Sequence, residues 1–251
     1  SLKNNIIWSE PNERATHHDF IQLPWGDYLG IGHEYQNLPI HATGGYQLQY
    51  QALDFLADGI TNEYPWYGDV LIIWDKDTRE EKWTWSTFDY FNTIDYDAIS
   101  WQGSPTGEYD WTHINAICYD ETDGSIYFSS RNLDRITKIQ IEYDENTGTI
   151  IGEDFIWNMG HDFPSGDATF GHDLGFSQQH SINITEEGNI IFFDNGNYAP
   201  SYWGAPYKTS RALEIAVTGT PGNYSANIEF EYILPEYLFG SAAGNVQKMN
   251  N

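Results

Sequence analysis

One structural unit occurs twice in this 251-residue chain: a histidine, a short apolar strand, a turn with acidic residues and glycine, an aromatic strand, and a polar cluster. The first copy starts at His113 and ends in Ser129-Ser130-Arg131, and the second starts at His180 and ends in Asp194-Asn195-Gly196. Four short antiparallel strands in each repeat of about 40–50 residues are typical of a propeller blade. We therefore predict an all-β fold, namely a β-propeller of four-stranded antiparallel blades.

The repeat predicts about three complete blades, at 17–85, 112–157 and 179–233, with residues 240–251 starting the next one. We assign residues 1–251 to a single β-propeller domain. Propellers usually have at least four blades, because each blade must be covered on both faces. Such a ring is incomplete, so we expect the chain to be part of a longer one. The alternative is self-association through the open blade edges.

Residues 35–67 interrupt the regular pattern. We expect an insertion or long loop there, with a short helix near Leu53–Ala57. Loop positions are also expected for four histidines, namely His33, His41, His161 and His172.

The net charge of the chain restricts the classes of partner that it can bind and indicates its cellular location. The formal net charge is −26, from 37 acidic and 11 basic residues. A surface this negative repels nucleic acid and anionic membranes, so we expect no nucleic-acid partner. It suits a secreted or periplasmic protein, and we predict an extracytoplasmic location. The sequence contains no apolar stretch long enough for a transmembrane helix, so no membrane insertion is expected.

Eight short motifs, in one order through nearly the whole chain, resemble the arylsulfotransferase family. Members of that family are β-propellers that transfer sulfuryl groups without phosphoadenosine phosphosulfate. The motifs are His17-His18-Asp19-Phe20 with Leu23-Pro24-x-Gly26, Asp110-Trp111-x-His113-x-Asn115, Ser129-Ser130-Arg131, Trp157-x-x-Gly160, Gln179-His180, Phe193-Asp194-Asn195-Gly196, Ser210-Arg211-Ala212, and Gly244-Asn245-Val246-Gln247.

The resemblance implies a ping-pong reaction in a histidine-lined central channel. An aryl sulfate gives its sulfuryl group to an enzyme histidine, and a phenolic acceptor then takes it. The partners are therefore small aryl sulfates and phenols, and no cofactor and no metal is expected. The matching positions assign catalysis to His113, His180, Arg211 and Arg131, and substrate binding to His17, His18, Asn115 and Tyr198.

The residue chemistry agrees with this assignment. A sulfuryl group in transfer carries negative oxygens, as a phosphoryl group does, and needs positioned donors and a nucleophile. Histidine is a suitable nucleophile or proton carrier near neutral pH, and the guanidinium fork of arginine matches anionic oxygens. In the family an arginine is expected soon after the Asp-Asn-Gly turn, but Asn197-Tyr198 stands there. The resemblance also implies a nucleophilic histidine after the Ser210-Arg211 motif, but no histidine follows His180.

Two alternative functions remain open at the sequence level. The first is a non-catalytic extracellular β-propeller that acts as a binding or assembly module, which the departures at Asn197-Tyr198 and after His180 favour. The second is a polysaccharide lyase-like propeller, which would also use histidine, tyrosine and arginine.

Overall fold

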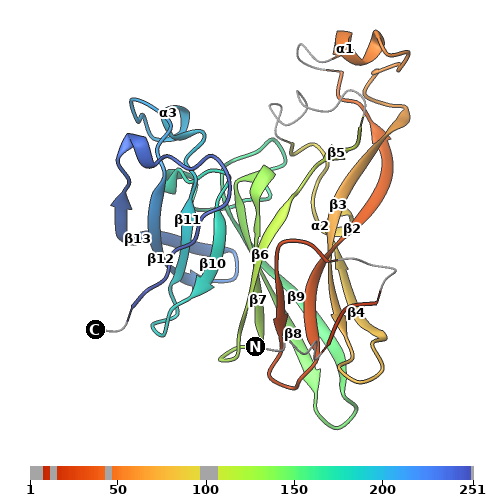
Figure 1. Cartoon of the computed structure of the whole chain (residues 1–251), viewed down its shortest axis with the longest axis vertical. Helices are drawn as coiled ribbons and strands as arrows, with labels where there is room; N and C mark the ends of the chain where they lie inside the picture. Colours follow the sequence, from red (N-terminus) through yellow and green to blue (C-terminus); the bar gives the residue numbers. More distant parts are fainter. Residues whose placement is uncertain (1–7, 12–15, 43–46, 97–106, 250–251) are drawn as a thin grey trace, which may run out of the picture.

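The computed structural model describes residues 8–11, 16–42, 47–96 and 107–249, which form three antiparallel sheets (Figure 1). In each sheet four consecutive strands lie in chain order, so each strand pairs with its neighbours in sequence. The longest helix of these residues, α1 (Gln47–Gln51), has five residues. No helix in the described ranges has the length and apolarity needed to cross a membrane. The prediction of an all-β fold is confirmed.

The first sheet contains β1 (Phe20–Gln22), β2 (Tyr28–Pro39), β3 (Asn62–Trp74) and β4 (Glu81–Ser86), with the short strand β5 (Tyr109–Asp110) parallel to β3. The expected irregular insertion at residues 35–67 holds only for the segment between β2 and β3, which contains α1, and was wrong for the residues on either side. Strand β2 continues to Pro39 and pairs with β3 along its whole length. The helix of this segment is α1 and not Leu53–Ala57, and His33 lies on β2 and not in a loop. A second short helix, α2 (Thr87–Tyr90), follows β4.

The second sheet contains β6 (Ile114–Asp120), β7 (Ser125–Ser130), β8 (Arg135–Asp144) and β9 (Thr149–Gly160). Its turns form where acidic residues and glycine predicted them. The carboxylate of Asp120 accepts the Thr122 N–H at 2.9 Å, and Gly124 and Gly148 have φ of 72° and 69°. Glycine is favoured at such positive φ because it has no Cβ. Two 3₁₀ turns flank this sheet, η2 (Arg131–Leu133) and η3 (His172–Leu174).

The third sheet contains β10 (His180–Ile184), β11 (Ile190–Asp194), β12 (Arg211–Thr220) and β13 (Asn223–Ile233), with the short helix α3 (Ala199–Tyr202) between β11 and β12 and η4 (Glu236–Leu238) after β13. Residues 240–249, expected to start another blade, contain no strand. They lie instead across the start of this sheet, where the Ala243 N–H donates to Nε2 of His180 at 3.3 Å.

The second sheet lies between the other two (Figure 1). All six residues of β7 are buried, because both faces of this strand are covered. Phe128 packs with Trp85 in the core shared with the first sheet, whereas Tyr127 and Phe192 belong to the core shared with the third sheet. Burial of such aromatic side chains is the main favourable term that holds the sheets together.

The first strands of the three sheets lie next to each other. The carboxylate of Asp19 accepts the backbone N–H of Ile117 on β6 at 3.0 Å. The Asn115 side chain donates to the backbone oxygen of Gln179, beside β10, at 2.8 Å. These contacts bring the starts of β1, β6 and β10 together, and the histidines of the repeated unit lie there.

Candidate functional site

Positive φ recurs where each first strand starts. His18, His113 and Gln178 have φ of 59°, 51° and 52° one or two residues before β1, β6 and β10, and Ser181 and Ala243 repeat the feature with 58° and 57°. Non-glycine residues rarely adopt this conformation, and such strain tends to occur at functional sites. His18 and His113 have positive φ themselves, whereas His180 lies between two positive-φ residues, Gln178 and Ser181. His113 and His180 therefore start neighbouring strands at different positions of the repeat.

His113 forms a histidine–carboxylate pair with Asp110. Nδ1 of His113 contacts Oδ2 of Asp110, and about a quarter of each side chain is exposed. The backbone oxygen of His113 accepts the N–H of Arg131 at 3.0 Å. A carboxylate on Nδ1 fixes the orientation of an imidazole and leaves Nε2 for chemistry, as in the serine protease triad.

His18 lies against this pair. Its ring centroid is 4.7 Å from that of His113, and its Nδ1 is 2.7 Å from Nδ1 of His17. Burial, and to a lesser extent the charges of His113 and His17, lower the pKa of His18 to about 4. His18 is therefore neutral at neutral pH.

His180 is bound more tightly into the framework. It is 9% exposed, and its Nδ1 donates to Oδ1 of Asn195 at 2.7 Å. Its Nε2 accepts the Ala243 N–H at 3.3 Å, so both ring nitrogens have partners. Burial lowers the pKa of His180, the charge of Arg131 adds to this, and the Asn195 hydrogen bond opposes it.

Arg131 connects the second and third sheets without an acidic partner. Its guanidinium donates to the side-chain oxygens of Asn132 at 2.7 Å and Gln178 at 3.0 Å. The Gln178 amide also donates to the hydroxyl of Tyr198 at 3.4 Å. In the described part of the chain, no carboxylate lies within ion-pair distance of Arg131. Its charge is therefore available to an anion.

Arg211 is in a different environment. It is 3% exposed, its Nε donates to Oδ2 of Asp194 at 2.8 Å, and a terminal nitrogen forms an ion pair with the same oxygen at 2.7 Å. It also pairs with Glu231 at 2.8 Å and donates to the Leu174 oxygen, and its guanidinium lies 4.8 Å from the Trp203 ring centroid. Every part of the guanidinium fork is used within the third sheet and its loops.

Asn115, assigned to substrate binding from the sequence, is 7% exposed and bridges the second and third sheets. Sequence reasoning missed Asp69 of β3, which is fully buried. Its Oδ2 accepts hydrogen bonds from the Thr112 hydroxyl at 2.5 Å and from the Ile114 N–H at 2.6 Å. Asp69 therefore anchors the start of β6 on both sides of His113. An acidic residue directly before an apolar run, in Gly68-Asp69-Val70, was the only sequence signal.

Asp69 is ionised in this site. Burial acts to raise its pKa, but the imidazoles of His17 and His33 and the Thr112 hydroxyl outweigh burial and hold the pKa below its usual range. Oδ1 of Asp69 lies 3.1 Å from Nε2 of His17 and 3.7 Å from Nδ1 of His33. The site thus contains four histidines of the strand starts and β2 within one connected set of contacts.

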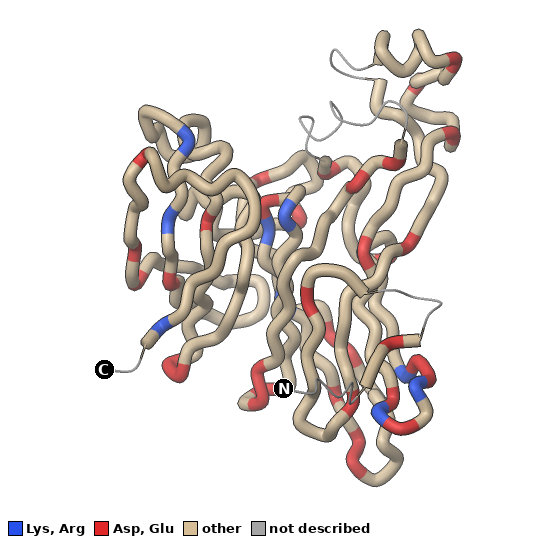
Figure 2. The backbone as a smooth tube through the Cα atoms, viewed as in Figure 1, with Lys and Arg blue, Asp and Glu red and all other residues tan. Residues whose placement is uncertain are grey.

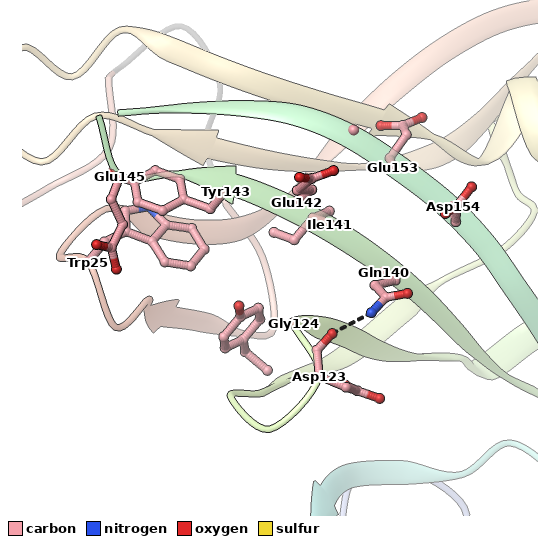
Figure 3. A pocket seen from close by; sticks show the side chains of 12 residues that line it. Trp25, Asp123, Gly124, Gln140, Ile141, Glu142, Tyr143, Glu145, Glu153 and Asp154 are labelled. Atoms are coloured by element: carbon pink, nitrogen blue, oxygen red, sulfur yellow. Dashed lines mark hydrogen bonds between the residues drawn. The ribbon is translucent and has the colours of Figure 1, made fainter. Parts of the chain in front are cut away.

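A groove elsewhere on the protein does not suit an anionic ligand. A groove of about 600 Å³ is lined by Trp25, Tyr119 and Tyr143 together with carboxylates (Figure 3), namely Asp123, Glu142, Glu145, Glu153 and Asp154. Acidic residues also lie across all three sheets, and Lys and Arg are sparse (Figure 2). Like charges repel, so this groove disfavours an anionic ligand.

The fold and these contacts define an all-β protein with a histidine- and arginine-rich site where its sheets meet. Residues 9–251 match the family model described as Arylsulfotransferase (ASST), so the chain belongs to the arylsulfotransferase family. A search of the curated proteins found no match to the chain.

Proposed function

We propose that the three sheets are propeller blades and that the protein transfers a sulfuryl group from an aryl sulfate to a phenol. The family supports arylsulfotransferase activity in general. The observation that carries the assignment to residues is the Asp110–His113 contact beside Arg131. We assign the nucleophile to Nε2 of His113, sulfuryl binding to Arg131, and the positioning of His113 to Asp110.

The reaction then proceeds in two displacements. Nε2 of His113 attacks the sulfur, a nitrogen–sulfur bond forms, and the sulfur–oxygen bond breaks as the phenolate leaves with its electron pair. The sulfonated imidazole is cationic, and Asp110 stabilises it through Nδ1–H. In the second step the acceptor oxygen attacks the sulfur and the nitrogen–sulfur bond breaks. The electron pair returns to Nε2, and the proton of the acceptor phenol neutralises the phenolate released in the first step.

Electrostatics favour this arrangement. The sulfuryl oxygens stay anionic during transfer, and positioned donors lower the energy of the transition state. The Arg131 guanidinium has only neutral amide partners, so it retains its attraction for such oxygens. We propose that His180 positions the site through Asn195, and that Arg211 has a structural role, because their polar groups are already bound within the protein.

The test is transfer from p-nitrophenyl sulfate to a phenol acceptor. We expect His113→Ala and Asp110→Asn to lower kcat/KM by about 100- to 10,000-fold, as expected for loss of nucleophile and acid–base function. His172→Ala is the matched control, because His172 lies on η3, outside the cluster, and contacts the backbone oxygen of Gly160. Equal activity of the wild-type protein and His113→Ala would refute the assignment.

One observation favours the non-catalytic binding module as a second candidate. Both nitrogens of His180 are hydrogen-bonded, so His180 does not offer a free atom to a substrate. Aryl sulfate binding without turnover, measured by calorimetry on the same preparation, would support this candidate. Production of unsaturated, ultraviolet-absorbing sugars from a sulfated glycan would instead support the lyase-like alternative.

A further inference from the structure

His17, His33 and Asp69 converge from neighbouring segments of the first sheet. His33 on β2 and Asp69 on β3 are directly paired across the two strands. Such cross-strand pairs project from the same face of a sheet. The backbone N–H of His17 donates to the Ile31 oxygen at 3.0 Å, which places His17 next to them just before β1.

Three polar atoms of this cluster are buried without a hydrogen-bond partner among the described residues. They are Nε2 of His17, Nδ1 of His33 and Oδ1 of Asp69. They lie within 4.8 Å of one another, and the carboxylate oxygen is 3.1 Å from one nitrogen and 3.7 Å from the other. Buried polar atoms are rarely left unpaired, because each has lost its hydrogen bonds to water. A cation between the three atoms would satisfy all of them at once.

The remaining atoms of these side chains are held in place. Oδ2 of Asp69 accepts hydrogen bonds from Thr112 and Ile114. The rings of His17 and His33 stack at 3.9 Å with an interplanar angle of 11°, and the edge of Tyr67 packs on His33 at 4.8 Å. The contacts of Thr112, Ile114 and Tyr67 lie outside the three side chains, and outer contacts of this kind orient the ligands of a metal site.

We propose that His17, His33 and Asp69 bind one divalent transition-metal ion of the zinc class. Two imidazole nitrogens and one carboxylate oxygen are ligands that zinc favours, whereas magnesium and calcium prefer oxygen alone. The side chains of His17 and His33 are 16% and 34% exposed, so the site is open on one side. The fourth ligand would therefore be water or an anionic oxygen.

The proposed ion would lie on the first sheet, which supplies all three ligands, against the start of β6. Asp69 holds that start in the second sheet through hydrogen bonds from Thr112 and Ile114. The ion would thus brace the backbone around His113. This role differs from the sulfuryl transfer proposed above, and it does not depend on that activity.

The experiment measures zinc binding to the whole protein after removal of metal with a chelator. Zinc is titrated by calorimetry with excess magnesium, which occupies the weak carboxylate sites of this acidic surface. We expect one equivalent of zinc to bind, and His33→Gln to weaken binding at least tenfold, because loss of contacts around a metal typically costs 10–100-fold or more in affinity. Zinc should also raise Tm in the wild-type protein and not in His33→Gln.

The partly exposed His33 is chosen for substitution because Asp69 variants would also disturb β6. His161→Gln is the matched control, since His161 stacks on Tyr202 outside the cluster, and it should bind zinc as the wild-type protein does. Cobalt(II) provides a second readout, with an absorption spectrum of tetrahedral nitrogen and oxygen ligation that His33→Gln abolishes. Equal zinc affinity and equal cobalt spectra in the wild-type protein and His33→Gln would overturn the proposal.

Discussion

Replacing Arg211 by leucine tests whether this arginine has a structural or a catalytic role. The substitution removes one hydrogen-bond donor and the ion pair of Asp194, and it leaves that carboxylate with no counter-ion in a fully buried position. Two backbone N–H donors, from Ser177 and Gly196, remain on the other oxygen at 2.9 and 2.8 Å. Breaking a buried pair by removing one partner costs about 3–5 kcal/mol. For a protein of this size, that loss corresponds to a fall in Tm of about 6–20 °C.

Arg131→Leu is the matched comparison. Arg131 bonds two neutral amide oxygens, so its loss should cost only about 1–3 kcal/mol of stability. We expect it instead to lower kcat/KM for aryl sulfate turnover. Urea unfolding followed by tryptophan fluorescence gives the stabilities, and a chromogenic sulfate ester gives the rates at a temperature where both variants are folded.

The opposite pattern would refute this reasoning. If Arg211→Leu kept the wild-type Tm and lost activity, while Arg131→Leu kept its activity, Arg211 would be the substrate-binding arginine. The buried pair with Asp194 would then contribute little to the stability of the third sheet.

Three further predictions follow from individual groups. Arg131→Gln should raise the pKa of His180, measured by NMR, because the substitution removes a positive charge that lowers this pKa. Folding depresses the pKa of His180, so its contribution to stability is present above pH 6.5. That contribution is lost as pH falls, because the unfolded chain binds the proton first. Burial raises the pKa of Cys118, so this thiol should react with a disulfide reagent at pH 8 only after urea denatures the protein. Gly196→Ala should destabilise the protein by about 2–4 kcal/mol in urea, because its Cβ would lie 1.7 Å from a backbone oxygen, whereas Gly188→Ala, with open space around it, should cost about 1 kcal/mol.

The strands of the second sheet could be predicted from the sequence because their signals are local. Apolar segments end at turns in which Asp120 and Asp144 accept nearby backbone N–H groups and glycine provides the positive φ. Residues 35–39 and 62–67 carry no such signal. Their strand conformation comes from pairing across an intervening segment of more than 20 residues, which a local pattern does not contain.

The residues of the candidate site also differ in whether a local sequence signal predicts them. The repeated histidine motifs identified His18 and His113, which the structure brings to 4.7 Å between ring centroids. The contribution of Asp69 depends on which strand lies beside β6, and that of His33 depends on the register of β2 with β3. Likewise, the Asp194 pair of Arg211 is visible only once β11 and β12 are aligned.

The most direct test of the proposed mechanism is the intact mass of the protein, recorded at neutral pH after mixing with p-nitrophenyl sulfate and no acceptor. We expect a gain of one sulfuryl group on the wild-type protein and on His180→Ala, its loss when a phenol is added, and no gain on His113→Ala. A covalent sulfuryl group that persists in His113→Ala, or that maps to another residue, would contradict the account.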